Sequence, residues 1–385
     1  MRRFESCRGH ISQAVPARTV ATVRAGVVCG RTTRSEARTV RAVVFDAVGA
    51  PPEVREVPEP VAPPAGVVVR VHATGLCRSD WHAWVGHDDI ALPHVPGHEL
   101  AGVVSAVGAG VTRWAVGDRV TVPFVEGCGV CAWCRSGNAQ VCPAQEQPGF
   151  THWGSFAEQV ALHAADTNLV AIPDGVGFEA AAALGCRFAT AYRGLVARAA
   201  LRRGEWLTVV GAGGVGLSAV MIAKALGARV VAVDRNAEAL EVARELGADH
   251  VLLADGSDVP AAVHELTDGG SHVAVDAVGS EQTSADAVLG LRRRGRHVQI
   301  GLLAPEDGGL PRLPMGRVIA WELDVLGSHG MAAVDYPGML ELIERGALAP
   351  QRLIERVVGL EEAAALLPVF DRATVAGMTM IDPLR

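Results

Sequence analysis

The sequence predicts an α/β protein with a doubly wound parallel sheet in its second half and a β-rich, barrel-like body before it. From residue 205 onward, apolar strand segments alternate with apolar helical segments, which is the pattern of a parallel sheet covered by helices on both faces. Between residues 40 and 187, valine-rich segments are interrupted by prolines, which indicates short strands joined by turns. A chain of 385 residues is long enough for two or three domains of about 100 to 200 residues each.

Composition and charge exclude several classes of protein. Hydrophobic residues make up 49% of the chain and charged residues 20%, which is typical of a globular protein and not of a disordered one. The formal net charge of −7 provides no basic surface for a nucleic acid. The uncharged stretch 206–223 contains four glycines, so we expect a strand, a turn and a helix there in place of a membrane span. We therefore expect neither a nucleic acid nor a membrane as partner.

The first 39 residues differ from the rest of the chain. They carry eight arginines against two glutamates, a net charge of +6, and have few large apolar residues and no helical or alternating period. We expect residues 1–39 to lie outside the fold, as a disordered or transit-type leader or because the start is assigned too early. The segment lacks the apolar region of a secretion signal, so we expect a cytoplasmic location.

A glycine-rich turn joins a predicted strand at 205–210 to a predicted apolar helix at 215–226. Gly211, Gly213 and Gly216 match the pattern G-x-G-x-x-G. The first glycine permits the turn, the second lets the backbone approach a pyrophosphate, and the third lets helix and strand pack closely. Such turns are common, but the strand before it and the helix after it favour a Rossmann-type dinucleotide site.

The end of the next predicted strand, 229–233, supports a dinucleotide site. Asp234 follows Gly211 by 23 residues, where a carboxylate can accept hydrogen bonds from an adenosine ribose. Because a carboxylate repels a 2′-phosphate, we expect NAD in preference to NADP. Arg235 favours NADP instead, since a guanidinium beside Asp234 can neutralise that phosphate.

The remaining strand and helix segments set the expected domain boundaries. They lie at 238–246, 250–253, 273–278, 285–291 and 297–300. We expect an NAD-binding Rossmann domain over 188–326 and a catalytic domain over 40–187, to which residues 327–385 return. A small substrate would then bind in the cleft between the two domains.

Four cysteines within fifteen residues indicate a metal site. Cys128, Cys131, Cys134 and Cys142 form C-x2-C-x2-C-x7-C in a glycine-rich segment that is predicted to be a loop. Four thiolates suit a tetrahedral structural zinc, which would hold a loop that has little core of its own. Two disulfides and an iron–sulfur cluster are the alternatives, although the cluster motif has a shorter last gap and a reducing compartment disfavours disulfides.

Five ordered motifs in residues 40–385 resemble those of the zinc-dependent medium-chain alcohol dehydrogenases, in the medium-chain dehydrogenase/reductase superfamily. They are CRSDWH at 77–82, GHE at 97–99, the four-cysteine loop, GCRFAT at 185–190 and GAGGVG at 211–216. The resemblance implies a GroES-like barrel for the catalytic domain. It also implies a catalytic zinc held by Cys77, His98 and Cys186, three residues that alone would be weak candidates.

The same resemblance implies roles for the neighbours of these ligands. Ser79 and His82 correspond to a relay that carries the alcohol proton through the cofactor ribose to the surface, and both residue types can transfer protons near neutral pH. Asp80 would orient the ring of His98. Glu99 would lie near the metal, either as a transient ligand or as a structural carboxylate paired with an arginine.

For the cofactor, the resemblance implies contacts from both sides of the cleft. Arg78 resembles a pyrophosphate-binding residue, Thr190 lies beside the nicotinamide ring, and Gly214 and Val215 belong to the turn, with Val215 behind the ring. The family often has a second pyrophosphate-binding arginine near the C-terminus; Arg372 is close, but the sequence around it departs from that pattern. The tryptophans at 81, 84 and 153 would narrow the substrate pocket.

These inferences predict an enzyme that transfers hydride between an alcohol, giving an aldehyde or ketone, and NAD, with one catalytic and one structural zinc per chain. A polyol, threonine or formaldehyde dehydrogenase on the same scaffold is the alternative among enzymes. A non-catalytic nucleotide-binding zinc protein is the alternative from another class. The apolar stretch 315–326 resembles the sheet edge through which relatives dimerise, so we expect a homodimer or homotetramer.

Overall fold

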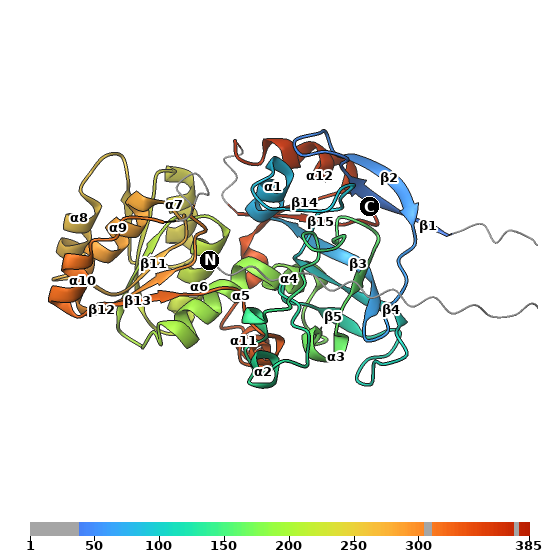
Figure 1. The fold of residues 1–385 in the computed structure, drawn as a ribbon. Coiled ribbons are helices and arrows are strands. Elements are labelled where there is room, and N and C mark those ends of the chain that lie inside the picture. Colours follow the sequence, from blue (N-terminus) through green and yellow to red (C-terminus); the bar gives the residue numbers. More distant parts are fainter. Residues whose placement is uncertain (1–37, 304–309, 373–376) are drawn as a thin grey trace, which may run out of the picture. The chain divides into compact units, whose positions relative to one another are not determined.

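The computed structural model describes residues 38–303, 310–372 and 377–385, which are drawn in colour in Figure 1. Residues 38–385 form one compact unit. The predicted leader therefore lies outside the described residues, except for its last two positions. The first strand begins at Thr39, one residue before the predicted start of the folded region.

The first part of the fold is built on antiparallel strands. β1 (Thr39–Val44) and β2 (Glu53–Pro58) form a hairpin. A seven-stranded sheet has the order β14-β15-β3-β4-β5-β7, with β6 also paired to β3. Its strands are β3 (Val67–Leu76), β4 (Leu100–Val107), β5 (Arg119–Thr121), β6 (Gln159–Leu162), β7 (Val170–Ala171), β14 (Ile354–Val358) and β15 (Met378–Ile381). Because β15 pairs with β3, the last strands of the chain belong to this seven-stranded sheet, which we call the first sheet.

The second part is a six-stranded sheet in which every pairing is parallel. Its order is β10-β9-β8-β11-β12-β13, which is the Rossmann order 3-2-1-4-5-6. The strands are β8 (Trp206–Val210), β9 (Arg229–Asp234), β10 (His250–Leu253), β11 (Ser271–Asp276), β12 (Leu291–Gln299) and β13 (Asp324–Gly327). The chain order reverses between β8 and β11, which is where such sheets bind their ligands.

Five helices follow the parallel strands: α6 (Gly214–Ala225), α7 (Ala237–Glu245), α8 (Val259–Leu266), α9 (Glu281–Leu289) and α10 (Met315–Trp321). Side-chain caps stabilise the N-termini of three of them. The side chains of Asn236, Asp258 and Ser280 accept hydrogen bonds from backbone amides in the first turns of α7, α8 and α9. Helix α6 is apolar and buries eight residues. The two-part α/β architecture predicted from the sequence is therefore confirmed.

Shorter helices surround the first sheet and link the two parts. They are α1 (Arg78–Val85), α2 (Ala132–Arg135), α3 (Ala165–Asn168), α4 (Phe178–Ala182), α5 (Ala189–Arg193), α11 (Tyr336–Glu344) and α12 (Leu360–Leu366). Two π-helical turns, η2 (Leu184–Phe188) and η3 (Gly194–Arg198), flank α5. The 3-10 turns are η1 (Ala139–Val141), η5 (Ala333–Asp335), η6 (Pro350–Leu353) and η7 (Leu367–Val369). Figure 1 shows α4, α5 and α6 between the two sheets.

The largest hydrophobic core is continuous across the two parts. It contains Ala73 and Ala101 of the first sheet, Leu207 and Val209 of the parallel sheet, and Leu184 of the link. A shared core holds the two sheets in a defined geometry. Within the described ranges, no helix combines the length and apolar character needed to cross a membrane.

Three local predictions need correction. The segment with four cysteines is not only a loop, because it contains helix α2 and turn η1. The predicted helix at 285–291 begins earlier and ends at Leu289, so that Leu291 already starts β12. Helix α8, which is only eight residues long, was not predicted.

Candidate active site

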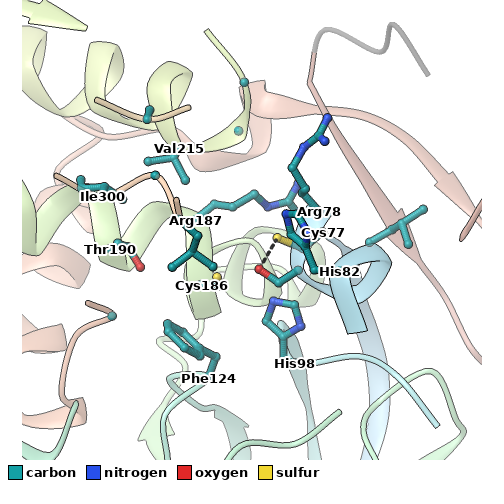
Figure 2. Close-up of a pocket in the computed structure, with 18 of the residues that line it drawn as sticks. Cys77, Arg78, His82, His98, Phe124, Cys186, Arg187, Thr190, Val215 and Ile300 are labelled. Carbon is teal, nitrogen blue, oxygen red and sulfur yellow. Dashed lines mark hydrogen bonds between the residues drawn. The ribbon is translucent and has the colours of Figure 1, made fainter. Parts of the chain in front are cut away.

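A cavity of about 480 Å³ is lined by residues of the first part of the chain, of the segments that follow strands of the parallel sheet, and of the link between the two parts. Figure 2 shows the residues on its wall. The first part of the chain contributes Cys77, Arg78, Ser79, His82 and His98; the link contributes Cys186, Arg187 and Thr190; and the glycine-rich turn contributes Gly213, Gly214 and Val215. Cys77 and Val215, which are 138 positions apart in the sequence, thus meet at one place.

The start of α1 places the first candidate metal ligand. β3 ends at Leu76, and Cys77 is the N-cap residue of α1. The carboxylate of Asp80, in the first turn, accepts a hydrogen bond from the Cys77 backbone amide at 2.8 Å. This contact occupies an amide that a helix start would otherwise leave unpaired, and it fixes the Cys77 thiol at the cavity wall.

Asp80 also orients His98. One oxygen of this fully buried carboxylate accepts hydrogen bonds from His98 Nδ1 and from the Gly97 amide, both at 3.0 Å. Because Nδ1 faces Asp80, the other ring nitrogen, Nε2, is directed elsewhere. Nε2 is buried and makes no hydrogen bond. A buried nitrogen without a partner is costly, and a metal ion would satisfy it.

Cys186 completes the group from the other side of the cavity. It lies in the π-helical turn η2, a conformation that often occurs at functional sites. The potential ligand atoms of Cys77, His98, Glu99 and Cys186 all lie within 4.8 Å of one another. Two sulfurs and an imidazole nitrogen are a donor set that zinc accepts, so the residues present fit a zinc ion.

The electrostatics of this group follow from its burial. The neighbouring Cys186 thiol stabilises the Cys77 thiolate and holds the pKa of Cys77 well below its ordinary value. The presence of Cys77, together with burial, raises the pKa of Cys186. Burial lowers the pKa of His98, but the charge and hydrogen bond of Asp80, together with the neighbouring Cys77, outweigh burial and raise this pKa well above the ordinary value. The site therefore concentrates negative charge around one buried point.

Glu99 has an arginine as its partner. Its carboxylate accepts hydrogen bonds from the Arg187 backbone amide at 3.0 Å and from Arg187 Nε at 2.9 Å, and it forms a short ion pair with Nη2. Both side chains are buried. Burial raises the pKa of Glu99, and the guanidinium opposes that rise. Of the two interpretations of Glu99 made from the sequence, the arginine-paired carboxylate agrees with these contacts.

Ser79 and His82 line the same cavity. Ser79 Oγ lies 3.9 Å from Cys77 Sγ. His82 Nδ1 lies 2.8 Å from Nδ1 of His87, a residue that sequence reasoning did not select. The contact arises at the C-terminus of α1, where Gly86 adopts φ +86° and the His87 amide donates to the His82 carbonyl, so that the chain folds back over His82. The sequence signal for this fold-back was the glycine after an apolar helical segment.

The glycine-rich turn has the geometry its residues imply. Gly211 has φ +97°, a conformation that favours glycine. A Cβ at Gly216 would lie 1.7 Å from the Gly211 carbonyl oxygen, so only glycine allows this approach of helix to strand. At Gly213, the N-cap of α6, a Cβ would meet nothing within 4 Å. Open space in front of the helix start suits the pyrophosphate of a dinucleotide.

Asp234 lies at the end of β9, beside this turn. Its carboxylate accepts hydrogen bonds from the amides of Ala212 at 2.6 Å and Asn236 at 2.8 Å. These contacts fix the carboxylate next to the turn, while Arg235 is exposed. Gly211, Gly216, Asp234 and Arg235 do not line the cavity itself, whereas Arg78, Thr190, Gly213, Gly214 and Val215 do.

The structure differs from two expectations about the cavity wall. The predicted role of the tryptophans was wrong, because none of the three lines the cavity. Trp81 and Trp84 pack against a separate core cluster, and Trp153 is exposed. Aromatic side chains from other segments, Phe124 and Phe150, line the cavity instead.

The arginine expected near the C-terminus is not in the cavity either. Arg372 is exposed and does not line it. Arg356 on β14 does, and it donates to Thr379 Oγ1 at 3.1 Å. Sequence reasoning missed Arg187 and Arg356 because their contacts lie 88 and 23 positions away in the chain. The only local signal for Arg187 was its position directly after Cys186.

The four-cysteine segment forms a second group of potential ligands. The sulfurs of Cys128, Cys131, Cys134 and Cys142 lie within 4.8 Å of one another, and Cys131 Sγ is 3.5 Å from Cys134 Sγ and 3.7 Å from Cys142 Sγ. Tetrahedral zinc with Zn–S bonds of ~2.3 Å places its sulfurs ~3.8 Å apart. Thiols this close leave room for one ion and not for a multi-iron cluster, and all four are free of disulfides.

Hydrogen bonds lower the pKa of two of these thiols, and burial raises that of a third. Amide hydrogen bonds from Val130 and Cys131 lower the pKa of Cys128 to about 6, and amide contacts also lower that of Cys131. Burial raises the pKa of Cys134 to about 12. Backbone amides aimed at sulfur are the usual support of a thiolate metal site.

Comparisons with known proteins agree with this geometry. Residues 63–174 match the model of the alcohol dehydrogenase GroES-like domain, and residues 214–345 match that of the zinc-binding dehydrogenases. An alcohol dehydrogenase of Geobacillus stearothermophilus is 35% identical over 336 residues, covering 86% of this chain and 96% of that protein. One of Rhizobium meliloti (strain 1021) is 34% identical over 348 residues, covering 89% and 99%. The crystal structure of an NAD-dependent alcohol dehydrogenase superposes with a TM-score of 0.81 at 33% identity, covering 89% and 99%.

A GroES-like part, a Rossmann sheet and a buried cluster of zinc-type ligands between them define a two-part zinc-binding oxidoreductase. More narrowly, the chain belongs to the zinc-dependent medium-chain alcohol dehydrogenase family. The resemblance seen in its motifs, the predicted GroES-like part and the predicted class of enzyme are thereby confirmed.

Proposed function

We propose that this enzyme transfers hydride between a small alcohol, which becomes an aldehyde or ketone, and NAD at the 480 Å³ cavity. One observation carries the proposal: the cavity brings Cys77, His98 and Cys186 to the same place as the turn Gly213–Val215. A metal-ligand cluster and a dinucleotide turn facing one cavity allow substrate and cofactor to meet there.

The ligand cluster supplies the acid side of the reaction. When bound, zinc provides a Lewis acid that polarises an alcohol or carbonyl oxygen. Cys77, His98 and Cys186 would hold it, and the contact between Asp80 and Nδ1 leaves Nε2 as the ring nitrogen available to the metal. Arg187 occupies both carboxylate oxygens of Glu99, and this pairing would compete with coordination of the metal by Glu99.

Ser79 and His82 move the alcohol proton. Ser79 lies beside Cys77, and its hydroxyl can accept one proton while donating another. His82 lies on the same helix and cavity wall and leads toward the exposed His87. Burial, followed by repulsion from His87 and Arg78, lowers the pKa of His82, so its ring is neutral and able to accept a proton at pH 7.

The remaining residues of the cavity position the alcohol and the NAD. Phe124 and Phe150 lie near His98, with ring centroids 6.1 and 5.2 Å from its own, and provide an apolar surface for the carbon skeleton of the alcohol. NAD supplies the hydride acceptor. Thr190 and Val215 flank its ring, and Arg78, Gly213 and Gly214 receive its phosphates. Asp234 binds the adenosine ribose and favours NAD over NADP, in agreement with the NAD-dependent relative.

The second cluster, Cys128, Cys131, Cys134 and Cys142, has a structural role and holds one zinc that ties its loop together. In this proposal residues 40–187 and 327–385 form the catalytic domain and residues 188–326 the cofactor domain. The enzyme acts in the cytoplasm, where its six described thiols stay reduced. It assembles as a homodimer or homotetramer through β13, which is an edge strand, and the exposed face of α10.

The proposal is tested with metal-quantified protein and a panel of primary alcohols, secondary alcohols, polyols, threonine and formaldehyde. Formation of reduced nicotinamide is followed by absorbance with NAD and with NADP. We expect turnover of one or more simple alcohols with NAD. Turnover confined to polyols, threonine or formaldehyde would assign the scaffold to that chemistry, and zinc-replete protein with no turnover would contradict the proposal.

A further inference from the structure

The charges on the cavity wall are strongly unequal. Among the described residues, three arginines line the cavity, Arg78, Arg187 and Arg356, against one carboxylate, Asp88. Guanidinium groups that face a common space repel one another, and an anionic ligand between them removes that cost. Glu99 pairs with Arg187 and Glu362 lies 3.8 Å from Arg356, so part of this positive charge is balanced, and the part that remains suits an anionic ligand.

Arg187 differs from the other two arginines in its burial. Its side chain is 7% exposed, whereas Arg78 is exposed and Arg356 half-buried. Nε and Nη2 of Arg187 are occupied by the carboxylate of Glu99. Nη1 has no hydrogen-bond acceptor in the described part of the chain. The Glu99 pair thus fixes the plane of the guanidinium and leaves one nitrogen with two free N–H donors.

The free side of Arg187 lies against the start of α6. A Cβ at Gly214 would meet Arg187 Cδ at 2.5 Å and Nε and Nη1 at 3.4 Å each. Gly214 is the first residue of this twelve-residue helix, so the guanidinium lies beside backbone amides that have no partner within the helix. In Figure 2 the Arg187 side chain lies between Val215 and the pair Cys77 and Cys186.

A buried, pre-oriented cation next to the open N-terminus of a helix provides two kinds of donor for the same anion. We propose that Arg187 binds the pyrophosphate of the dinucleotide through Nη1, as a cofactor anchor that acts with the turn at Gly213 and Gly214. This inference rests on the proposed NAD site. It assigns to Arg187 the role that the family often gives to an arginine near the C-terminus; Arg372, the nearby arginine here, has a side chain that is 82% exposed and lies outside the cavity.

The test measures binding without turnover. Calorimetric dissociation constants are determined on full-length, zinc-replete protein for AMP, which lacks the pyrophosphate, for ADP-ribose, which contains it, and for NADH. Replacement of Arg187 alone leaves the buried Glu99 charge without a partner, which destabilises the fold. The main variant is therefore the double replacement Arg187→Met with Glu99→Gln, compared with Glu99→Gln alone.

We expect the double variant to bind ADP-ribose and NADH about 10- to 100-fold more weakly, as for the loss of one charge-assisted hydrogen-bond donor, with AMP affinity unchanged within about 3-fold. Glu99→Gln keeps the arginine and one side-chain oxygen that can orient it, so this variant should bind ADP-ribose more tightly than the double variant does. Arg372→Met is the matched control and should bind all three ligands as the wild type does.

Several outcomes would overturn the role of Arg187. These are unchanged ADP-ribose binding in the double variant, equal losses for AMP and ADP-ribose, an equal loss in Glu99→Gln, or a loss in Arg372→Met alone. Failure of the wild type to bind ADP-ribose or NADH is a different result, because it would contradict the NAD site itself.

Discussion

At the scale of single residues, Asp80 shows how one buried carboxylate organises a metal site. It accepts hydrogen bonds from the Cys77 amide, the Gly97 amide and His98 Nδ1. These contacts connect the end of β3, the start of α1 and the loop before β4. The positions of two candidate ligands therefore depend on a residue that need not touch the metal.

His82 is the residue whose role depends most on pH. Burial and the neighbouring His87 and Arg78 lower its pKa below the ordinary value of 6.5, so the ring accepts protons throughout the neutral range. We expect His82→Ala to slow alcohol oxidation about 100-fold near pH 6.5 and much less near pH 9, where hydroxide can remove the proton. Steady-state rates measured across this range check the prediction. A deficit that is the same at every pH would remove His82 from the proton path.

Asp234 is predicted to select between the two dinucleotides. Asp234→Gly removes a carboxylate that repels a 2′-phosphate, so the ratio of kcat/KM with NAD to that with NADP should fall about 100-fold. Asp234→Gly also removes the contacts with Ala212 and Asn236, and any resulting loss of folded enzyme lowers both kcat/KM values equally and cancels in the ratio. Arg235→Ala, the adjacent control, should leave NAD turnover unchanged. An unaltered ratio in Asp234→Gly would place cofactor selection elsewhere.

At the scale of elements, the two cysteine clusters have different supports. The four-cysteine segment relies on short helical pieces, α2 and η1, and its sulfurs are close to the surface. Cys77 instead directly follows β3 and Cys186 lies inside η2, and both elements contribute residues to the continuous core. Loss of its metal should therefore destabilise the four-cysteine segment far more than loss of the other metal destabilises the region around Cys77 and Cys186.

Matched variants test this difference. Cys131→Ala should lower the midpoint of thermal unfolding by about 5 to 10 °C and reduce turnover only modestly, because its metal ties a loop. Cys186→Ala should reduce turnover at least about 1,000-fold with little change in the midpoint. Calorimetry and steady-state kinetics on the same preparations separate the effects. Equal unfolding of both variants would contradict the separate roles.

Elements with a local signature were predictable from the sequence. The glycine-rich turn and the four-cysteine segment depend on spacings within about twenty residues, and the structure forms both. The catalytic cluster was found through family resemblance, because Cys77, His98 and Cys186 are joined only by the fold. The tryptophan prediction failed because composition does not show which face of α1 packs against the core. Arg187 was missed because its partner, Glu99, lies in a distant segment.

At the scale of the whole molecule, the proposed assembly rests on one exposed surface. β13 ends the parallel sheet with an unpaired edge, and Val325 on it is 42% exposed. On the neighbouring α10, Ile319 is 74% exposed and Met315 51%. Exposed apolar side chains beside an open edge strand are an association surface.

A charge at this surface tests the proposed assembly. Ile319→Glu should convert the homodimer or homotetramer to a smaller species, because burying an unpaired carboxylate opposes association. Light scattering coupled to size-exclusion chromatography gives the mass of each variant. Val334→Glu, at an exposed position outside α10 and β13, is the control. A wild-type monomer, or an assembly that Ile319→Glu leaves intact, would contradict assembly through this edge.

The proposed reaction depends on one zinc ion that Cys77, His98 and Cys186 would hold between the two parts of the chain. The zinc content of purified wild type, Cys77→Ala and Cys186→Ala, determined by mass spectrometry of the metal, tests it most directly. We predict about two zinc ions per chain in the wild type and about one in each variant, with the four-cysteine site still filled. Two ions retained in both variants would show that these residues do not hold the catalytic metal.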